Sequence, residues 1–334
     1  MREAADRTPN DVIISASGLV KHYPVASKSV LPTPPKHLHA LDGVDISIRK
    51  GEIFGVVGES GCGKSTLGRC LLHLTDITAG SIIFRGQDIT HKSRHELKPL
   101  RKDMQMIFQN PFSSFNPKLK IGASLREVGH VHGISKQATQ ERIAELLDDI
   151  SLPEDMLSRS PGELSGGQLQ RLAIARALLL NPSFIVADEP VSALDVSVQA
   201  QILNLLMDIR SKFSLTMLFI SHEMTVVRHL CDTVAVMYLG VVVEQAKTDE
   251  LFARLAHPYT QALMSAIPRV DPQARLERIV LQGDIPNAID IPTGCRFATR
   301  CVKCEPVCTS RAPALRDIGG GHLVACHFAK GMNV

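Results

Sequence analysis

The sequence predicts an α/β fold built around an open parallel β-sheet. Short apolar runs of strand length alternate with segments of helical periodicity along most of the chain. Polar residues suited to ligand binding follow several of these apolar runs, and open parallel sheets bind ligands beyond the carboxyl ends of their strands. We expect right-handed crossovers between neighbouring strands.

Composition limits the classes of protein to consider. The 334 residues are enough for one large domain and a smaller one, and the net charge of +3 indicates no strong nucleic-acid field. No apolar run approaches the roughly 20 residues of a membrane helix. The first seven residues lack the apolar core of a secretion signal. We therefore expect a soluble protein that stays in the cytoplasm.

The strongest motif is a glycine-rich turn between the apolar run Ile53–Val57 and a helical segment. It matches the phosphate-binding pattern G-x-x-x-x-G-K-[ST]. Its glycines let backbone N–H groups face a phosphate, and its lysine and serine suit the terminal phosphates and a Mg²⁺ ion. The residues are Gly58, Glu59, Ser60, Gly61, Cys62, Gly63, Lys64 and Ser65, followed by Thr66.

The residues before this turn predict three strands. Asp11–Val20 is typical of an edge strand, and Val25–His39, with its prolines, of an irregular loop. Leu41–Arg49 is expected to pair with Glu52–Val57 across a Lys50–Gly51 turn. Tyr23 either stacks on an adenine or packs on the core; the residues alone favour neither.

The middle of the chain predicts two further strands and a helical region. Gly80–Phe84 and Met104–Phe108 have strand character, and Ser124–His132 and Gln137–Ile150 have helical periodicity. Gln109 follows the second strand, where its amide either touches a metal or a water beside the phosphates or is an ordinary surface residue.

A serine and two glycines begin the amphipathic helix Leu169–Leu180. Such a helix start is a second anion-binding terminus. The motif comprises Leu164, Ser165, Gly166, Gly167 and Gln168.

Two more strands end in candidate residues. The buried run from Phe184 ends in Asp188, suited to Mg²⁺, and Glu189, placed to orient or deprotonate a water. Ser192 or Asp195 would cap the helix Val196–Lys212. Leu215–Ile220 precedes His222, which either contacts a γ-phosphate or is an unremarkable strand-end histidine.

Taken together, these residues resemble the nucleotide-binding subunit of an ABC transporter over roughly residues 11–255. The matches are Tyr23, Walker A, the Q-loop Gln109, the LSGGQ signature, Walker B with Asp188 and Glu189, the D-loop Ser192–Asp195 and the switch His222. The resemblance implies a P-loop ATPase fold: a parallel core sheet, an antiparallel β subdomain and a helical subdomain at about 110–180 within a domain of residues 11–256. It implies catalytic roles for Glu189, His222 and Gln109, and Mg²⁺ held at Ser65, Gln109 and Asp188.

The resemblance also implies an assembly. Two subunits sandwich two ATP molecules, each phosphate loop facing the partner's signature motif, so that hydrolysis depends on closure. We expect a second ATPase subunit, which relatives suggest is a paralogue, two membrane permeases and an extracytoplasmic binding protein, with this chain on the cytoplasmic face of the membrane.

Residues 257–334 contain five of the eight cysteines. Closely spaced cysteines in a reducing compartment suggest a metal or a cluster before disulfides. Four thiolates suit a [4Fe–4S] cluster or a zinc ion, and geometry alone does not decide. Free buried thiols are the alternative.

This tail is similar to the C-terminal extension of oligopeptide and dipeptide importer ATPases, through the HPYT, GCRFATRC and LVACH segments. That resemblance implies a [4Fe–4S] cluster on Cys295, Cys301, Cys308 and Cys326. Cys304 is additional and could replace a neighbour. The function expected is an ATPase that energises peptide import. A nickel importer, or a soluble ABC protein acting on ribosomes or DNA, is the alternative.

Overall fold

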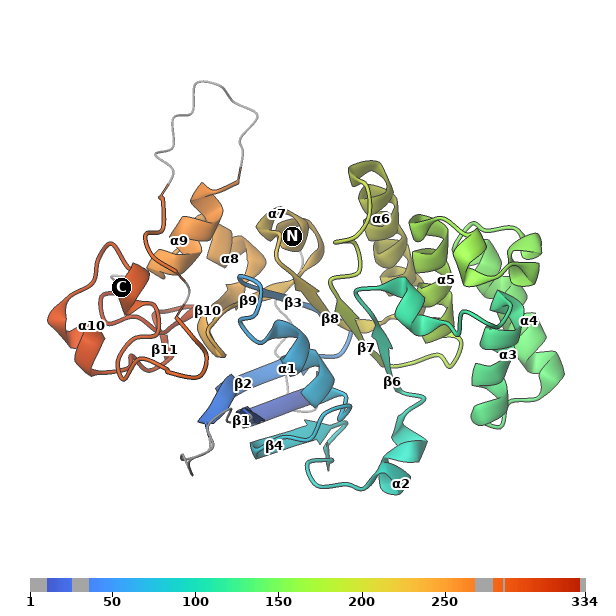
Figure 1. Ribbon diagram of the computed structural model, residues 1–334, viewed down its shortest axis with the longest axis horizontal. Coiled ribbons are helices and arrows are strands. Elements are labelled where there is room, and N and C mark those ends of the chain that lie inside the picture. The colour runs from blue at the N-terminus through green and yellow to red at the C-terminus, as the bar shows by residue number, and fades with distance from the viewer. Residues whose placement is uncertain (1–10, 26–35, 268–278, 285, 331–334) are drawn as a thin grey trace, which may run out of the picture. The chain divides into compact units, whose positions relative to one another are not determined.

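The computed structural model describes residues 11–25, 36–267, 279–284 and 286–330, and two compact units divide them (Figure 1). The first unit holds residues 11–13, 48–52 and 91–220, and the second holds the remaining described residues. Each unit is described by itself.

The first unit contains three parallel strands. These strands, in spatial order, are β6 (Met104–Ile107), β7 (Phe184–Asp188) and β8 (Thr216–Ser221). Every residue of β7 and β8 is buried, as expected for strands whose both faces are covered. The parallel sheet predicted from the apolar runs is confirmed here.

The helices of the first unit lie mostly where periodicity predicts them. They are α2 (Arg94–Leu97), α3 (Ile121–Val131), α4 (Lys136–Asp149), α5 (Gly166–Leu178) and α6 (Val196–Phe213), with short 3₁₀ turns at Lys98–Leu100, Pro111–Ser114, Glu154–Ser158 and Pro161–Glu163. Figure 1 shows α3, α4 and α5 packed side by side. The helix α5 begins three residues earlier than predicted, because the glycines of the signature form its first turn.

The second unit contains a mixed run of strands. β3 (Ile53–Val57) lies parallel to β9 (Thr233–Tyr238), and β10 (Val241–Lys247) is antiparallel to β9. Two short strands of the tail, β12 (Leu323–Val324) and β11 (Arg316–Asp317), continue the order beyond β10. The tail is therefore loop-rich, as expected, but it also extends the sheet.

A separate antiparallel sheet corrects two predictions. Its order is β2 (Lys36–Arg49), β1 (Val12–Val25), β4 (Ala79–Phe84) and β5 (Gln87–Asp88). The edge position predicted for Asp11–Val20 is wrong, because β1 has β2 and β4 as neighbours. The hairpin of Leu41–Arg49 with Glu52–Val57 is also wrong: β3 is buried at all five residues and pairs with β9, whereas β2 alternates buried and exposed residues in the other sheet.

Part of the predicted loop Val25–His39 is also strand. Residues 36–39 belong to β2, and residues 26–35 lie outside the described residues.

The helices of the second unit are α1 (Lys64–Leu71), α7 (Met224–Leu230), α8 (Thr248–Ala253), α9 (Pro258–Ser265) and α10 (Pro306–Ser310), with a 3₁₀ turn at Ala298–Arg300. Within the described ranges, no helix combines the length and the apolar character needed to cross a bilayer.

Candidate functional site

The phosphate-binding loop lies between β3 and α1 in the second unit, as predicted. Gly63 forms the N-cap of α1 with a φ of 106°, in the left-handed region. A Cβ at Gly63 would lie 2.2 Å from the carbonyl oxygen of Ala40, so any side chain would collide with backbone. Glycine is therefore required both for the turn and for this close approach.

Lys64 is folded over the loop. Its ammonium donates to the carbonyl oxygens of Gly58 at 2.8 Å and Glu59 at 3.1 Å, and its side chain is buried. Ser65 and Thr66 are half-buried in the first turn of α1. Burial raises the pKa of the Cys62 thiol, which keeps it protonated and makes it a packing residue rather than a nucleophile.

Tyr23 lies near the end of β1 with its side chain half-buried. The Lys21 ammonium stands 4.7 Å from the centroid of its ring, on the same strand two residues earlier. A half-buried ring is consistent both with stacking on an adenine and with packing against the core, so both predictions stand.

The strand-end acids lie in the first unit, at the end of β7. Asp188 is 2% exposed and pairs in register with Ile220 of β8. Glu189 has a φ of 45°, a left-handed conformation that non-glycine residues rarely adopt, and such strain of about 1–3 kcal/mol gathers at functional positions. The Gln109 amide donates to the Glu189 carboxylate at 3.0 Å, and the Ser192 hydroxyl donates to its carbonyl oxygen at 3.1 Å.

The signature segment forms the start of α5 in the same unit. Ser165 caps the helix: its hydroxyl accepts from the Gln168 N–H at 3.3 Å, and its own N–H donates to the Gln168 side chain at 3.1 Å. Ser165 and Gly166 are exposed, whereas Leu164 is buried. A Cβ at Gly167 would lie 2.6 Å from a methyl group of Val198.

The remaining nucleotide-site candidates have looser surroundings. Asp195 is exposed and occupies the predicted N-cap position of α6. Its side chain makes no capping hydrogen bond to the helix. His222, in the second unit, is half exposed with its Nε2 3.8 Å from a Glu223 carboxylate oxygen. The amide of Gln109 and the carboxylate of Glu189 are brought into direct contact within the first unit.

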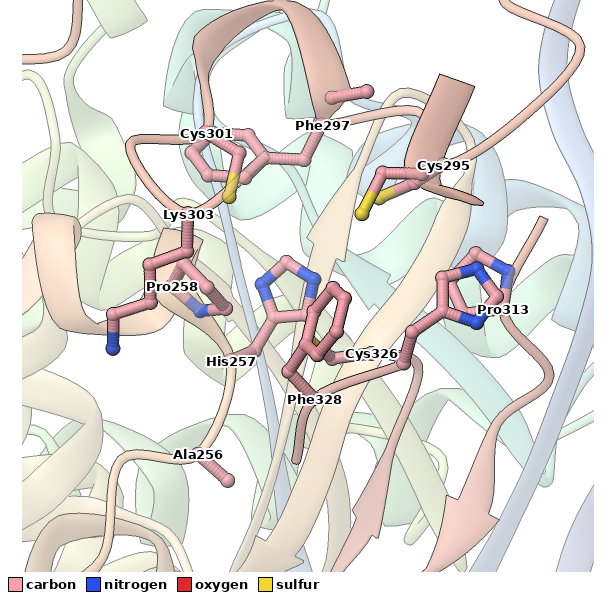
Figure 2. A pocket seen from close by; sticks show the side chains of 13 residues that line it. Ala256, His257, Pro258, Cys295, Phe297, Cys301, Lys303, Pro313, Cys326 and Phe328 are labelled. Atoms are coloured by element: carbon pink, nitrogen blue, oxygen red, sulfur yellow. The ribbon is translucent and has the colours of Figure 1, made fainter. Parts of the chain in front are cut away.

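Four tail cysteines line one cavity in the second unit. Cys295, Cys301, Cys308 and Cys326 surround it together with Phe297 and Phe328, and Figure 2 shows Cys295 and Cys301 directed into it. The backbone holds two of them together, since the Cys295 N–H donates to the Cys308 carbonyl at 2.7 Å. Burial, and then the neighbouring sulfurs, raise the pKa of Cys295 to about 11. Cys304 is exposed, outside the set that lines the cavity.

The spacing of the sulfurs discriminates between the two metal groups. Around one tetrahedral zinc with bonds of about 2.3 Å, sulfurs lie about 3.8 Å apart. Among the described residues, one set of three His, Cys, Asp or Glu side chains has ligand atoms within 4.8 Å of one another, and it is His22, His39 and Asp42. No three of the cysteine sulfurs are therefore that close together. A polynuclear cluster sits between its ligands and spaces them more widely. The cavity that the four cysteines line has a volume of about 50 Å³, more than one water needs.

Comparison with known proteins matches both parts of the chain. Residues 41–192 match the family model described as ABC transporter, and residues 243–308 match that of the oligopeptide/dipeptide transporter C-terminal region. A Brucella ovis protein named for peptide import and ATP binding is 49% identical over 94% of this chain and 97% of its own length. The oligopeptide transport ATP-binding protein AppF of Bacillus subtilis is 44% identical over 95% and 98%.

The chain belongs to the ABC transporter ATP-binding subunits of the oligopeptide/dipeptide importer family. As an ABC ATPase, it is an ATP-hydrolysing transporter subunit. It is similar in fold to the dimeric ATP-binding cassette MJ0796 bound to ADP and Pi, with a TM-score of 0.62 and 27% identity over 70% of this chain and 98% of that one.

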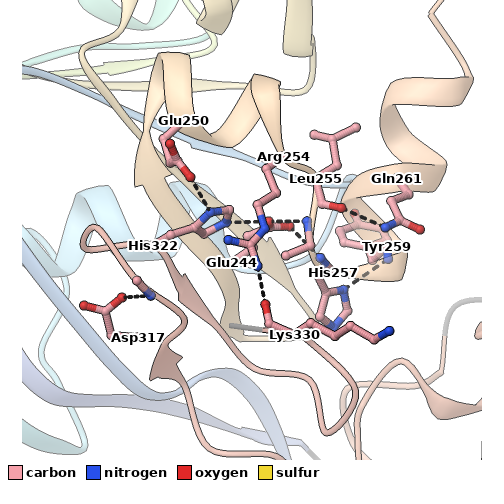
Figure 3. Close-up of polar contacts among 12 residues, drawn as sticks. Glu244, Glu250, Arg254, Leu255, His257, Tyr259, Gln261, Asp317, His322 and Lys330 are labelled. Carbon is pink, nitrogen blue, oxygen red and sulfur yellow. Dashed lines mark hydrogen bonds and ion pairs between the residues drawn. The ribbon is translucent and has the colours of Figure 1, made fainter. Parts of the chain in front are cut away.

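The structure of this ABC subunit contains a buried polar network that sequence reasoning missed. Glu244 accepts from His322 at 2.8 Å and from the backbone N–H groups of Ala256 and His257 at 2.7 and 3.0 Å (Figure 3). Glu244 and His322 are fully buried. Only the acidic residue in the apolar strand β10 could have signalled it, because a charge there needs partners.

A second unpredicted group joins two strands of the antiparallel sheet. His22 and His39 approach the two carboxylate oxygens of Asp42 at 3.2 and 3.6 Å. The Arg296 guanidinium also binds Asp42, and these partners outweigh burial to hold the pKa of the carboxyl below its usual range. His39 and Asp42 are only three residues apart on β2, but His22 and Arg296 lie far from them in the sequence, so no local pattern links the four.

Proposed function

We propose that the chain energises import of dipeptides or oligopeptides through an ABC transporter. The observation that carries this proposal is the similarity of nearly the whole chain to peptide import ATP-binding proteins, tail included. Because ATPase subunits couple hydrolysis to permeases, cargo selection falls to the partners, and the peptide assignment rests on this relationship.

The proposed residue roles follow the family motifs. The triphosphate binds the backbone of the loop Gly58–Thr66 and the Lys64 ammonium, and Tyr23 stacks on the adenine. Ser65, Gln109 and Asp188 hold Mg²⁺, Glu189 activates the attacking water, and His222 has a catalytic role. The donor set suits this ion, since hydroxyl, amide and carboxylate oxygens are the ligands that Mg²⁺ prefers. The exposed Ser165 and Gly166, with Gln168 and Asp195, face the nucleotide of a second subunit.

The proposed assembly contains a paralogous ATPase, two permeases and an extracytoplasmic binding protein, with this chain peripheral on the cytoplasmic face of the membrane. The exposed start of α5 supports the pairing, because the N-terminus of a helix attracts an anion such as a partner's γ-phosphate. The chain would divide at residue 257 into the ATPase domain and the extension.

Reconstitution tests the proposal. The chain is co-expressed with candidate permeases and a paralogous ATPase, the complex is placed in liposomes, and ATP hydrolysis is measured with binding protein carrying a dipeptide, an oligopeptide or Ni²⁺. Stimulation by peptide alone is expected. Stimulation by Ni²⁺ alone, or recovery of the chain with ribosomes or DNA instead of permeases, would reject it.

We also propose that Cys295, Cys301, Cys308 and Cys326 hold a [4Fe–4S] cluster. The wide spacing of the sulfurs around one cavity supports it. When bound, the cluster would supply iron–thiolate bonds that tie together the loops carrying these cysteines. The chain's own part is to hold the four thiols around the cavity until iron replaces their protons.

A further inference from the structure

Within the second unit, a residue of the tail forms an ion pair with a residue of the phosphate-binding loop. Arg300 donates from its two terminal nitrogens to the two carboxylate oxygens of Glu59, at 2.6 and 3.1 Å. The Arg300 side chain is 8% exposed and that of Glu59 25%. A bidentate, mostly buried pair fixes the orientation of both groups, unlike a solvated surface pair.

A second contact holds the same loop residue from α9. The Tyr259 hydroxyl accepts the Glu59 backbone N–H at 2.8 Å, and Tyr259 is fully buried. Its ring packs on Phe297 with centroids 5.3 Å apart, and both rings pack on Tyr238. Both the side chain and the backbone of Glu59 are therefore held by the extension.

A third contact reaches the loop through the turn after β9. The Arg296 guanidinium donates to the carbonyl of Leu239, and the next residue, Gly240, donates its N–H to the Cys62 carbonyl at 2.9 Å. Arg296, Phe297 and Arg300 all lie between Cys295 and Cys301. This short segment therefore contacts Glu59 directly through Arg300, and it contacts two residues next to the loop, Tyr259 through Phe297 and Leu239 through Arg296.

The charge of Glu59 explains why such a contact matters. Its carboxylate projects from the loop that carries Lys64, where a triphosphate of about four negative charges would bind. An unpaired carboxylate there would repel the nucleotide, and Arg300 neutralises it.

We propose that Arg300 is a positioning residue for nucleotide binding, which masks the charge of Glu59 and fixes the phosphate-binding loop for Mg·ATP. The segment between Cys295 and Cys301 thereby sets the affinity of the loop for ATP. This inference rests on the proposed binding of ATP at that loop.

The test compares equilibrium binding of Mg·ATP to the full-length chain and its variants. Arg300→Ala weakens binding roughly tenfold or more, given the strength of close charge interactions, and Arg300→Lys, which lacks the fork, has an intermediate effect. Adding Glu59→Gln to Arg300→Ala restores affinity to within roughly threefold, because the repelling charge is gone.

Arg311→Ala is the matched control, since it removes an exposed arginine from the same tail, and it leaves affinity unchanged. Thermal melts and iron content are measured on every variant. Unchanged affinity in Arg300→Ala, or a loss that Glu59→Gln does not relieve, would overturn the inference. Failure of the wild type to bind ATP would reject the proposed function instead.

Discussion

The side-chain amide of Gln109 donates a hydrogen bond to the Glu189 carboxylate across 3.0 Å. The contact joins the end of β6 to the end of β7, two neighbouring parallel strands. Because Glu189 is also held in a left-handed backbone conformation, its side chain has a defined direction.

Glu189→Gln should abolish turnover while leaving nucleotide binding. Replacing the general base by a neutral amide lowers ATPase activity by roughly 10²- to 10⁴-fold, since proton removal from water is lost. Phosphate release and Mg·ATP binding are measured in parallel. Asp148→Asn, an exposed acid on α4, serves as the control and keeps full activity. Unchanged hydrolysis in Glu189→Gln would remove this residue from the mechanism.

Gly63→Ala should disrupt the phosphate-binding loop more than Gly61→Ala. Both glycines have positive φ, but a Cβ at Gly63 would meet the Ala40 carbonyl at 2.2 Å, whereas that at Gly61 would have open space. We expect the Gly61 variant to lose about 1 kcal/mol from backbone strain and the Gly63 variant more than roughly 2 kcal/mol, with loss of ATP binding. Urea denaturation and ATP titration measure both effects; equal losses would contradict the steric explanation.

Glu244→Ala should strongly destabilise the second unit. It removes the acceptor for His322 and for two backbone N–H groups in a site without solvent, and breaking such a buried pair costs about 3–5 kcal/mol. Glu250→Ala is the matched control, because Glu250 is partly exposed and lies 3.7 Å from the other nitrogen of His322. The control should lose under about 1 kcal/mol. Chemical denaturation compares them, and similar midpoints would argue against the network.

Cys308→Ser should remove iron from the anaerobically purified protein, whereas Cys304→Ser should retain it. Cys308 is buried and lines the cavity with Cys295, but Cys304 is exposed. Iron and acid-labile sulfide are assayed together with zinc. One zinc and no iron in the wild type would replace the proposed cluster by a zinc site, and iron loss in Cys304→Ser would change the ligand set.

Much of the fold could be predicted because local patterns specify it. The buried strand ending at Asp188 and the helix beginning at the signature follow from an apolar run and a capping sequence. Strand pairing was predicted less well: the Lys50–Gly51 turn exists, but it leads from one sheet into the other. Neighbouring strands need not pair when one of them is fully buried and has a parallel partner.

The individual site motifs were recognisable, but the contacts that orient them were not. Gln109 and Glu189 lie 80 residues apart, and Glu59 and Arg300 lie 241 apart, so no local pattern connects either pair. Ion pairs between distant residues depend on packing that sequence periodicity does not describe.

The pairing of β12 along β10 gives the tail a protective role as well. An uncovered outer strand offers unpaired N–H and C=O groups to any similar strand nearby. A chain cut before residue 316 would leave β10 bare and would deprive Glu244 of His322. Such shortened chains should therefore self-associate, and proteolytic cleavage of the extension would lead to aggregation rather than to a smaller soluble ATPase.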